Sequence, residues 1–195
     1  MRKLSTHIVR NLVPPADEAL LVPSIGRVLS ELRGRPVRLR EAAFPPATAS
    51  GLWIDRASHD LIVYEENTDP EHQLVIIGHE AWHMFQGHGR SGHDHGPAAT
   101  RSGGPPAGRA LAEFVARVAD ADGSELPQAE RTDIAIHLAS RADTPEAREE
   151  EEAEHFGIRF ATDVKAALAG ACGATDPQNL AGRIQSSMAH RFPRA

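Results

Sequence analysis

Two histidines and a glutamate occur within five residues near the middle of the chain. The segment is His79-Glu80-Ala81-Trp82-His83, so its two imidazoles are four residues apart. On a helix, side chains at this spacing share a face and could bind one zinc ion, while Glu80 could take a proton from a water on that ion. The pattern is short, and a chain with eleven histidines could contain it by chance. Its interpretation therefore depends on a helix that carries it and on a third ligand.

The residues around this segment predict a helix from about Pro70 to Gln86. Thr68 or Asp69 can cap its start, Pro70 suits the first turn, and Gly87 can end it. At about 100° per residue, the two histidines fall on roughly the opposite side from an apolar stripe. The members of that stripe are Leu74, Ile77, Ala81, Met84 and Phe85. We therefore expect the stripe to anchor the helix and the histidines to face a cleft.

Two parts of the sequence could supply the third ligand. His88 follows the first segment, but it points to the apolar side unless the helix breaks before it. A later acidic run, at residues 148–168, also has a helical pattern. On its helical wheel Glu151 points outward, whereas Glu149 and Glu152 flank the apolar stripe. Both of these glutamates remain candidates on spacing alone, and a catalytic site needs only three protein ligands.

The remaining pattern predicts a mostly helical α+β domain with a small antiparallel sheet packed against the helix at 70–86. Alternating residues indicate a strand at 36–42 and a β-hairpin at about 51–66. A Gly/His-rich segment at 87–109 is expected to be a long mobile loop. Further helices are predicted at about 17–33, 109–120, 127–140, 144–169 and 177–191.

Composition narrows the classes of function. A length of 195 residues suits one domain over 1–195, and a net charge of −6 without a basic stripe argues against direct nucleic-acid binding. No apolar run approaches a membrane span, and the first residues lack a secretory signal, so we expect a cytoplasmic protein. Cys172 is the only cysteine, which rules out an intrachain disulfide and a zinc site made of cysteines.

Together, the two motifs resemble those of the ImmA/IrrE family of zinc metallopeptidases. The family pairs a His-Glu-x-x-His helix with a later Glu-Ala-(Asn/Asp/Glu)-x-Phe-(Ala/Gly) helix. In this sequence the second motif is the segment at 152–157, EAEHFG, and the hairpin at 51–66 is also similar. The resemblance implies a zincin-like fold and a zinc ion held by His79, His83 and Glu152, with Glu149 as the second choice.

The resemblance also implies an activity. We expect a zinc-dependent endopeptidase that acts on a regulatory protein of the helix-turn-helix repressor type, with Glu80 taking a proton from the attacking water. The donor that stabilises the oxyanion is left open among Tyr64, His93, His95, His137 and His155. The alternative is a zinc-binding regulator or toxin component that acts by binding a partner protein, with little or no proteolysis.

Overall fold

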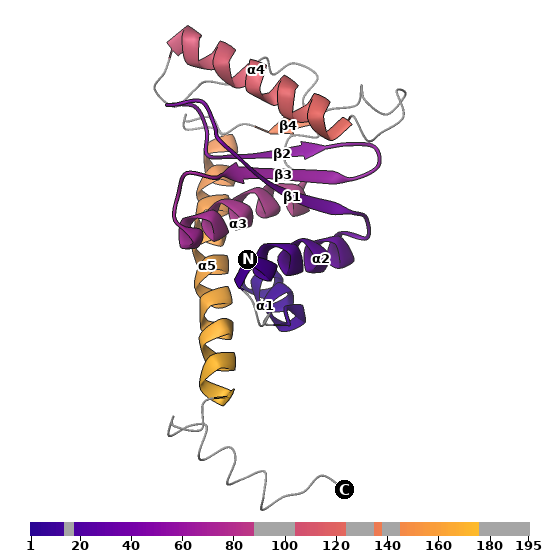
Figure 1. Cartoon of the computed structure of the whole chain (residues 1–195), viewed down its shortest axis with the longest axis vertical. Coiled ribbons are helices and arrows are strands. Elements are labelled where there is room, and N and C mark those ends of the chain that lie inside the picture. The colour runs from indigo at the N-terminus through magenta and orange to yellow at the C-terminus, as the bar shows by residue number, and fades with distance from the viewer. Residues whose placement is uncertain (14–17, 88–103, 124–134, 138–144, 176–195) are drawn as a thin grey trace, which may run out of the picture.

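A four-stranded sheet separates one helix from four others in the computed structural model (Figure 1). The structure describes residues 1–13, 18–87, 104–123, 135–137 and 145–175. Its elements are α1 (Arg2–Asn11), a 3-10 turn (Glu18–Leu20), α2 (Leu21–Arg33), β1 (Val37–Ala42), β2 (Gly51–Asp55), β3 (Asp60–Glu65), α3 (Pro70–Gln86), α4 (Gly104–Gly123), β4 (Ala135–His137) and α5 (Pro145–Thr175). The α+β class predicted from the sequence is confirmed. Among the described helices, none combines the length and apolar character needed to cross a membrane.

The sheet is mixed, which corrects the prediction of an antiparallel sheet. Its strand order is β1-β3-β2-β4; β2 is antiparallel to β3 and to β4, whereas β1 is parallel to β3. The predicted hairpin of β2 and β3 is confirmed, but β3 returns between β2 and β1. Alternation of apolar residues specifies which face of a strand is buried and leaves open its neighbours and their direction, so the parallel pair could not be predicted.

Both faces of the central strands are buried. One face packs against α4 and forms a small apolar cluster, which includes Leu52, Ile54, Leu61, Val63 and Phe114. The opposite face packs against the layer of α1, α2, α3 and α5 and includes Trp53 and Ile62. A sheet covered on both faces has nearly continuous apolar strands, as in the LIVY segment of β3.

Helix α3 has the bounds that the sequence predicted, Pro70 to Gln86. The Asp69 side chain accepts a hydrogen bond of 2.9 Å from the His72 backbone N–H, and Gly87 ends the helix with a φ of 70°. The helix is buried on more sides than expected, since Ile76 is covered as well as the apolar stripe. The cause is that α3 lies between the sheet and α5 and packs against both.

Helices α3 and α5 cross where each has a glycine. A Cβ added to Gly78 would lie 3.0 Å from the Gly157 Cα, and a Cβ added to Gly157 would collide with the Val75 carbonyl oxygen. The same Cβ would lie 3.2 Å from the His79 backbone nitrogen. The two helix backbones therefore approach so closely that only glycine fits at positions 78 and 157.

Four other sequence predictions have mixed outcomes. The helix predicted at 144–169 is confirmed as α5, and α4 begins at Gly104, inside the predicted loop at 87–109. Residues 135–137 form β4, which corrects the helix predicted at 127–140 over those residues. Residues 135–137 pair with β2. This contact joins segments that are distant in the sequence, so the local sequence carries no signal for it. The helix predicted at 177–191 lies outside the described residues.

A pair of glycines on α5 tests the crossing. Changing Gly157→Ala should lower the free energy of unfolding by about 1–3 kcal/mol, because the added methyl group overpacks the contact with α3. The matched change Gly170→Ala lies on the same helix, where a Cβ meets nothing within 4 Å. It should raise that free energy by up to about 1 kcal/mol, since alanine favours the helix. Urea unfolding followed by circular dichroism measures both, and similar values for the two variants would contradict a close crossing.

Candidate metal centre

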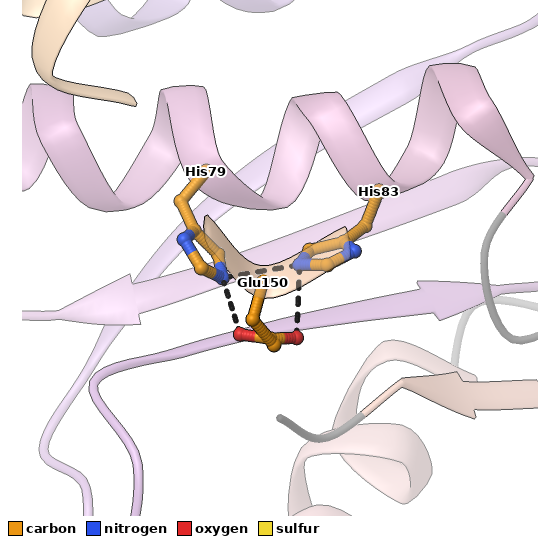
Figure 2. Close-up of side chains that lie close together, drawn as sticks. All are labelled: His79, His83 and Glu150. Atoms are coloured by element: carbon orange, nitrogen blue, oxygen red, sulfur yellow. Dashed lines mark hydrogen bonds and ion pairs between the residues drawn. The ribbon is translucent and has the colours of Figure 1, made fainter. Parts of the chain in front are cut away.

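Two histidines of α3 and one glutamate of α5 meet at a single point (Figure 2). The His79 and His83 Nε2 atoms are 3.1 Å apart. Glu150 places Oε2 3.5 Å from the His79 Nε2 and Oε1 3.3 Å from the His83 Nε2. Three potential ligand atoms thus converge from two helices, and the prediction that the two histidines share a face is confirmed.

The helix crossing explains how α5 delivers its carboxylate. Glu150 is seven residues before Gly157, two turns earlier on the same face of α5. Gly157 contacts α3 at Val75 and His79, and the preceding turns of α5 run toward His83. The position of Glu150 is therefore set by the same contact that brings the two helices together.

Glu150 takes the place that the family resemblance implied for Glu152. The structure leaves Glu152 exposed, because two residues along a helix amount to a rotation of roughly 200°. Glu149, the second choice, is half-buried and does not belong to the cluster. His88 lies outside the described residues. The third candidate ligand is thus corrected from Glu152 to Glu150.

A signal for Glu150 was present in the sequence. The buried residues of α5 include Ala153, Phe156, Gly157 and Phe160. Continuing this stripe toward the N-terminus by three residues from Ala153 leads to Glu150. A glutamate on the buried stripe of a helix needs a partner, whereas its neighbours in the acidic run can be solvated.

The two imidazole nitrogens and the Glu150 carboxylate lie at distances that suit ligands of one zinc ion. Zinc bonds to histidine nitrogen and carboxylate oxygen of 2.0–2.1 Å, arranged as a tetrahedron, place adjacent ligand atoms about 3.3–3.4 Å apart. The two ring nitrogens are 3.1 Å apart, and they lie 3.5 and 3.3 Å from the two different oxygens of the Glu150 carboxylate, so each contact is close to that value. The set of two imidazoles and one carboxylate is also one that catalytic zinc sites use, with a fourth position left for water. The residues present therefore fit a zinc ion.

The cluster is buried, and its electrostatics favour a cation. His83 is fully buried and Glu150 is 7% exposed, whereas the His79 side chain is 20% exposed. Burial by itself raises the pKa of Glu150, but hydrogen bonds and positive charge from His79 and His83 lower that pKa well below its usual range. The carboxylate is therefore charged and faces the two ring nitrogens. Positive charge at this point, from a bound cation or from protonated imidazole, compensates a buried carboxylate.

Glu80 lies beside the cluster without belonging to it. Its carboxylate is 6% exposed and accepts a hydrogen bond from the Trp53 backbone N–H of β2. Burial raises the pKa of Glu80 to about 7, while the charge of His79 lowers it and the charge of Glu150 raises it. A carboxylate with a pKa near neutrality can both accept and return a proton.

The first residue of β2 leaves room for Glu80. A Cβ added to Gly51 would lie 2.5 Å from the Glu80 Oε1 and 2.7 Å from the Ile76 Cγ2. Any other residue at this position would push the carboxylate or the helix away. Gly51 and the Trp53 amide together hold Glu80 against the start of β2.

None of the described candidates for an oxyanion donor is seen in the cluster. Tyr64 is on β3 and faces a groove beside β1, and burial followed by the charge of Glu41 raises its pKa. His155 is exposed on α5. The backbone of His137 pairs with that of Trp53. The His137 side chain, and both His93 and His95, are not among the described parts of the structure.

A second buried polar cluster joins the β2–β3 turn to the end of α4. The Asp122 Oδ2 atom lies 2.8 Å from the His59 Nε2 and 2.9 Å from the Arg56 Nε, and Ser58 Oγ lies 3.0 Å from the His59 Nδ1. Asp122 is also paired with Arg38. A Ser-His-Asp chain can activate a nucleophile, but here two guanidinium groups already neutralise the aspartate. We therefore interpret this cluster as the attachment of α4 to the sheet.

Comparison of the chain with protein-family models, with curated proteins and with solved structures found no match. The chemistry of the site is therefore inferred from its own geometry.

Zinc binding by glutamate variants distinguishes Glu150 from its neighbours in the acidic run. Changing Glu150→Gln should weaken zinc binding by at least about a hundredfold, because it removes the charged ligand of a buried site. Glu152→Gln and Glu149→Gln should bind zinc as the parent protein does. Competition with a chromophoric chelator, using protein without a histidine tag, measures all three affinities. Loss of affinity in Glu152→Gln with retention in Glu150→Gln would contradict the assignment.

Proposed function

We propose that the protein is a zinc-dependent peptidase in which His79, His83 and Glu150 hold the metal and Glu80 is the general base. The observation that carries the proposal is the convergence of two imidazole nitrogens and the Glu150 carboxylate, with a second buried carboxylate, that of Glu80, beside them. A site meant only to bind zinc has no need for Glu80, and a closed structural site has four protein ligands. Three ligands and a base are the requirements of hydrolysis.

Each residue then has a definite task. A bound zinc ion would supply a Lewis acid for the scissile carbonyl and would lower the pKa of a water toward neutrality. Glu80 would accept a proton from that water at a carboxylate oxygen and deliver it to the leaving amine nitrogen as the C–N bond breaks. Gly51 and the backbone N–H of Trp53 would keep that carboxylate in position.

The proposed substrate is a regulatory protein of the helix-turn-helix repressor type. This part of the proposal rests on the resemblance of the two sequence motifs. Cleavage of such a protein would let a chain without a basic surface stripe influence transcription through its partner.

A second candidate is a zinc-binding regulator or toxin component that acts by binding a partner protein. The burial of the site favours it, because His83 is 0% exposed and Glu80 is 6% exposed. Among the three ligands, only His79 has a side chain that is appreciably exposed to solvent. An extended peptide would have to approach from that side. The two candidates share their zinc ligands and differ in whether Glu80 is used.

Replacing the base tests which candidate holds. Glu80→Gln should keep its zinc and lose hydrolysis by about 10²–10⁴-fold, because it removes general-base catalysis alone. The control is Glu154→Gln, an exposed change on α5 that should have no effect. Cleavage is followed with a quenched fluorescent peptide library and by the fragments of a co-expressed helix-turn-helix repressor. Equal hydrolysis by Glu80→Gln and the parent would overturn the peptidase mechanism, and a zinc-loaded parent that binds the repressor without fragments would favour the second candidate.

A further inference from the structure

Strand β1 has one edge that faces away from the sheet. On its inner side, the Pro36 carbonyl accepts a hydrogen bond from the Asp60 N–H, and the Ala42 carbonyl accepts one from the Glu66 N–H. In a parallel pair the residues that bond to the neighbour alternate along the strand. The N–H and C=O groups of the even-numbered residues of β1 therefore point toward β3, and those of the odd-numbered residues point outward.

Part of this outer edge is already used by α2. The Val37 N–H donates a hydrogen bond of 2.8 Å to the Ser30 Oγ. Leu39 and Glu41 come next along the edge, and within the described part of the chain no strand pairs with them. Two residues of β1 thus present their main-chain groups in the direction of a possible added strand.

A groove lies along the same edge. Its volume is about 1240 Å3, and it runs between α2, β1, the first turns of α3 and the later turns of α5. Figure 1 shows β1 beside α2 at this end of the sheet. Apolar side chains line part of it, among them Val22, Leu39 and Leu168. An extended segment beside β1 could therefore place alternate side chains against an apolar surface.

Cationic residues lie along the groove and on the edge strand beside it. The residues that line the groove include four cationic ones, Arg27, Arg38, Arg40 and Lys165, and two acidic ones, Glu41 and Glu71. Arg27, Arg38 and Lys165 have acidic partners in ion pairs. Arg40 is exposed on the edge strand itself. Side chains alternate along a strand, so Arg38 and Arg40 share the face opposite Leu39. A strand added beside β1 would place side chains on that face next to Arg40, where acidic ones are favoured.

We propose that this surface, the β1 groove, binds an extended segment of a partner protein in which apolar and acidic side chains alternate. The segment adds to the sheet as a strand beside Leu39 and Glu41. A second copy of the chain fits less well, because antiparallel pairing of two β1 strands about Leu39 would set Arg38 of one copy opposite Arg40 of the other, and like charges in direct opposition destabilise a sheet.

The β1 groove is separate from the metal centre. None of the residues that line it is His79, His83, Glu80 or Glu150. Lys165, which does line it, is fifteen residues beyond Glu150 on α5, a distance of about 22 Å along the helix. The proposal therefore concerns docking of a partner and holds whether or not the metal centre is catalytic.

A proline at the outward-facing position tests the strand pairing. The Glu41→Pro change removes an N–H that points away from β3, a place where edge strands tolerate proline. Glu41→Ala is the matched control, since it removes the same side chain and keeps the N–H. The probe is a fluorescent ten-residue peptide of alternating valine and glutamate, and a valine-lysine peptide of equal length controls for charge. Fluorescence anisotropy gives the affinities, and circular dichroism checks that each variant is folded.

The valine-glutamate peptide should bind the parent and Glu41→Ala with similar affinity, and Glu41→Pro at least about tenfold more weakly, because a backbone hydrogen bond is lost. The charge reversal Arg40→Glu should shift preference toward the valine-lysine peptide, and it serves as the test if Glu41→Pro does not fold. Three results would overturn the proposal: no saturable binding of the valine-glutamate peptide, equal affinity for Glu41→Pro and Glu41→Ala, or no change in peptide preference on Arg40→Glu. Sedimentation that shows a dimer lost in Glu41→Pro would instead assign the edge to a second copy.

Discussion

The close approach of α3 and α5 at Gly78 and Gly157 is the constraint on which the rest of the site depends. At this crossing the two backbones meet without side chains between them, since a Cβ at Gly157 would strike the Val75 carbonyl oxygen. Two turns earlier on α5, the same face carries Glu150 into contact with His79 and His83. A wider crossing would move the carboxylate away from the imidazoles, because packed helices shift as rigid units.

The crossing also creates an electrostatic problem that the site's chemistry resolves. It buries the charged Glu150 beside two imidazoles, one of them fully buried, next to a second buried carboxylate in Glu80. Carboxylates at such depth need positive charge nearby. A divalent cation at the point where the two imidazoles and the carboxylate converge would supply that charge. Glu80 is held by the Trp53 amide in the space that Gly51 leaves, and in the proposed function it is the proton acceptor.

Local features of the sequence predicted local structure well. The bounds of α3, its Asp69 cap and the β2–β3 hairpin followed from capping residues, a glycine stop and alternation. The features that depend on distant contacts were not predicted: the parallel pairing of β1 and the strand at 135–137. For the third ligand, the family motif indicated Glu152, whereas the buried stripe of α5 leads to Glu150. An acidic run offers several chemically equal glutamates, and they differ in their position relative to the buried stripe of α5, which includes Glu150 and leaves Glu152 exposed.

X-ray absorption at the zinc edge tests the central claim most directly. On the zinc-loaded parent protein, the first shell should contain four nitrogen or oxygen neighbours at about 2.0–2.1 Å, with the outer-shell pattern of two imidazoles. In Glu150→Gln this shell should be lost or reorganised, whereas in Glu152→Gln it should be unchanged. A six-coordinate oxygen shell without imidazole scattering in the parent protein, or a spectrum that responds to Glu152 and not to Glu150, would contradict a metal centre formed by His79, His83 and Glu150.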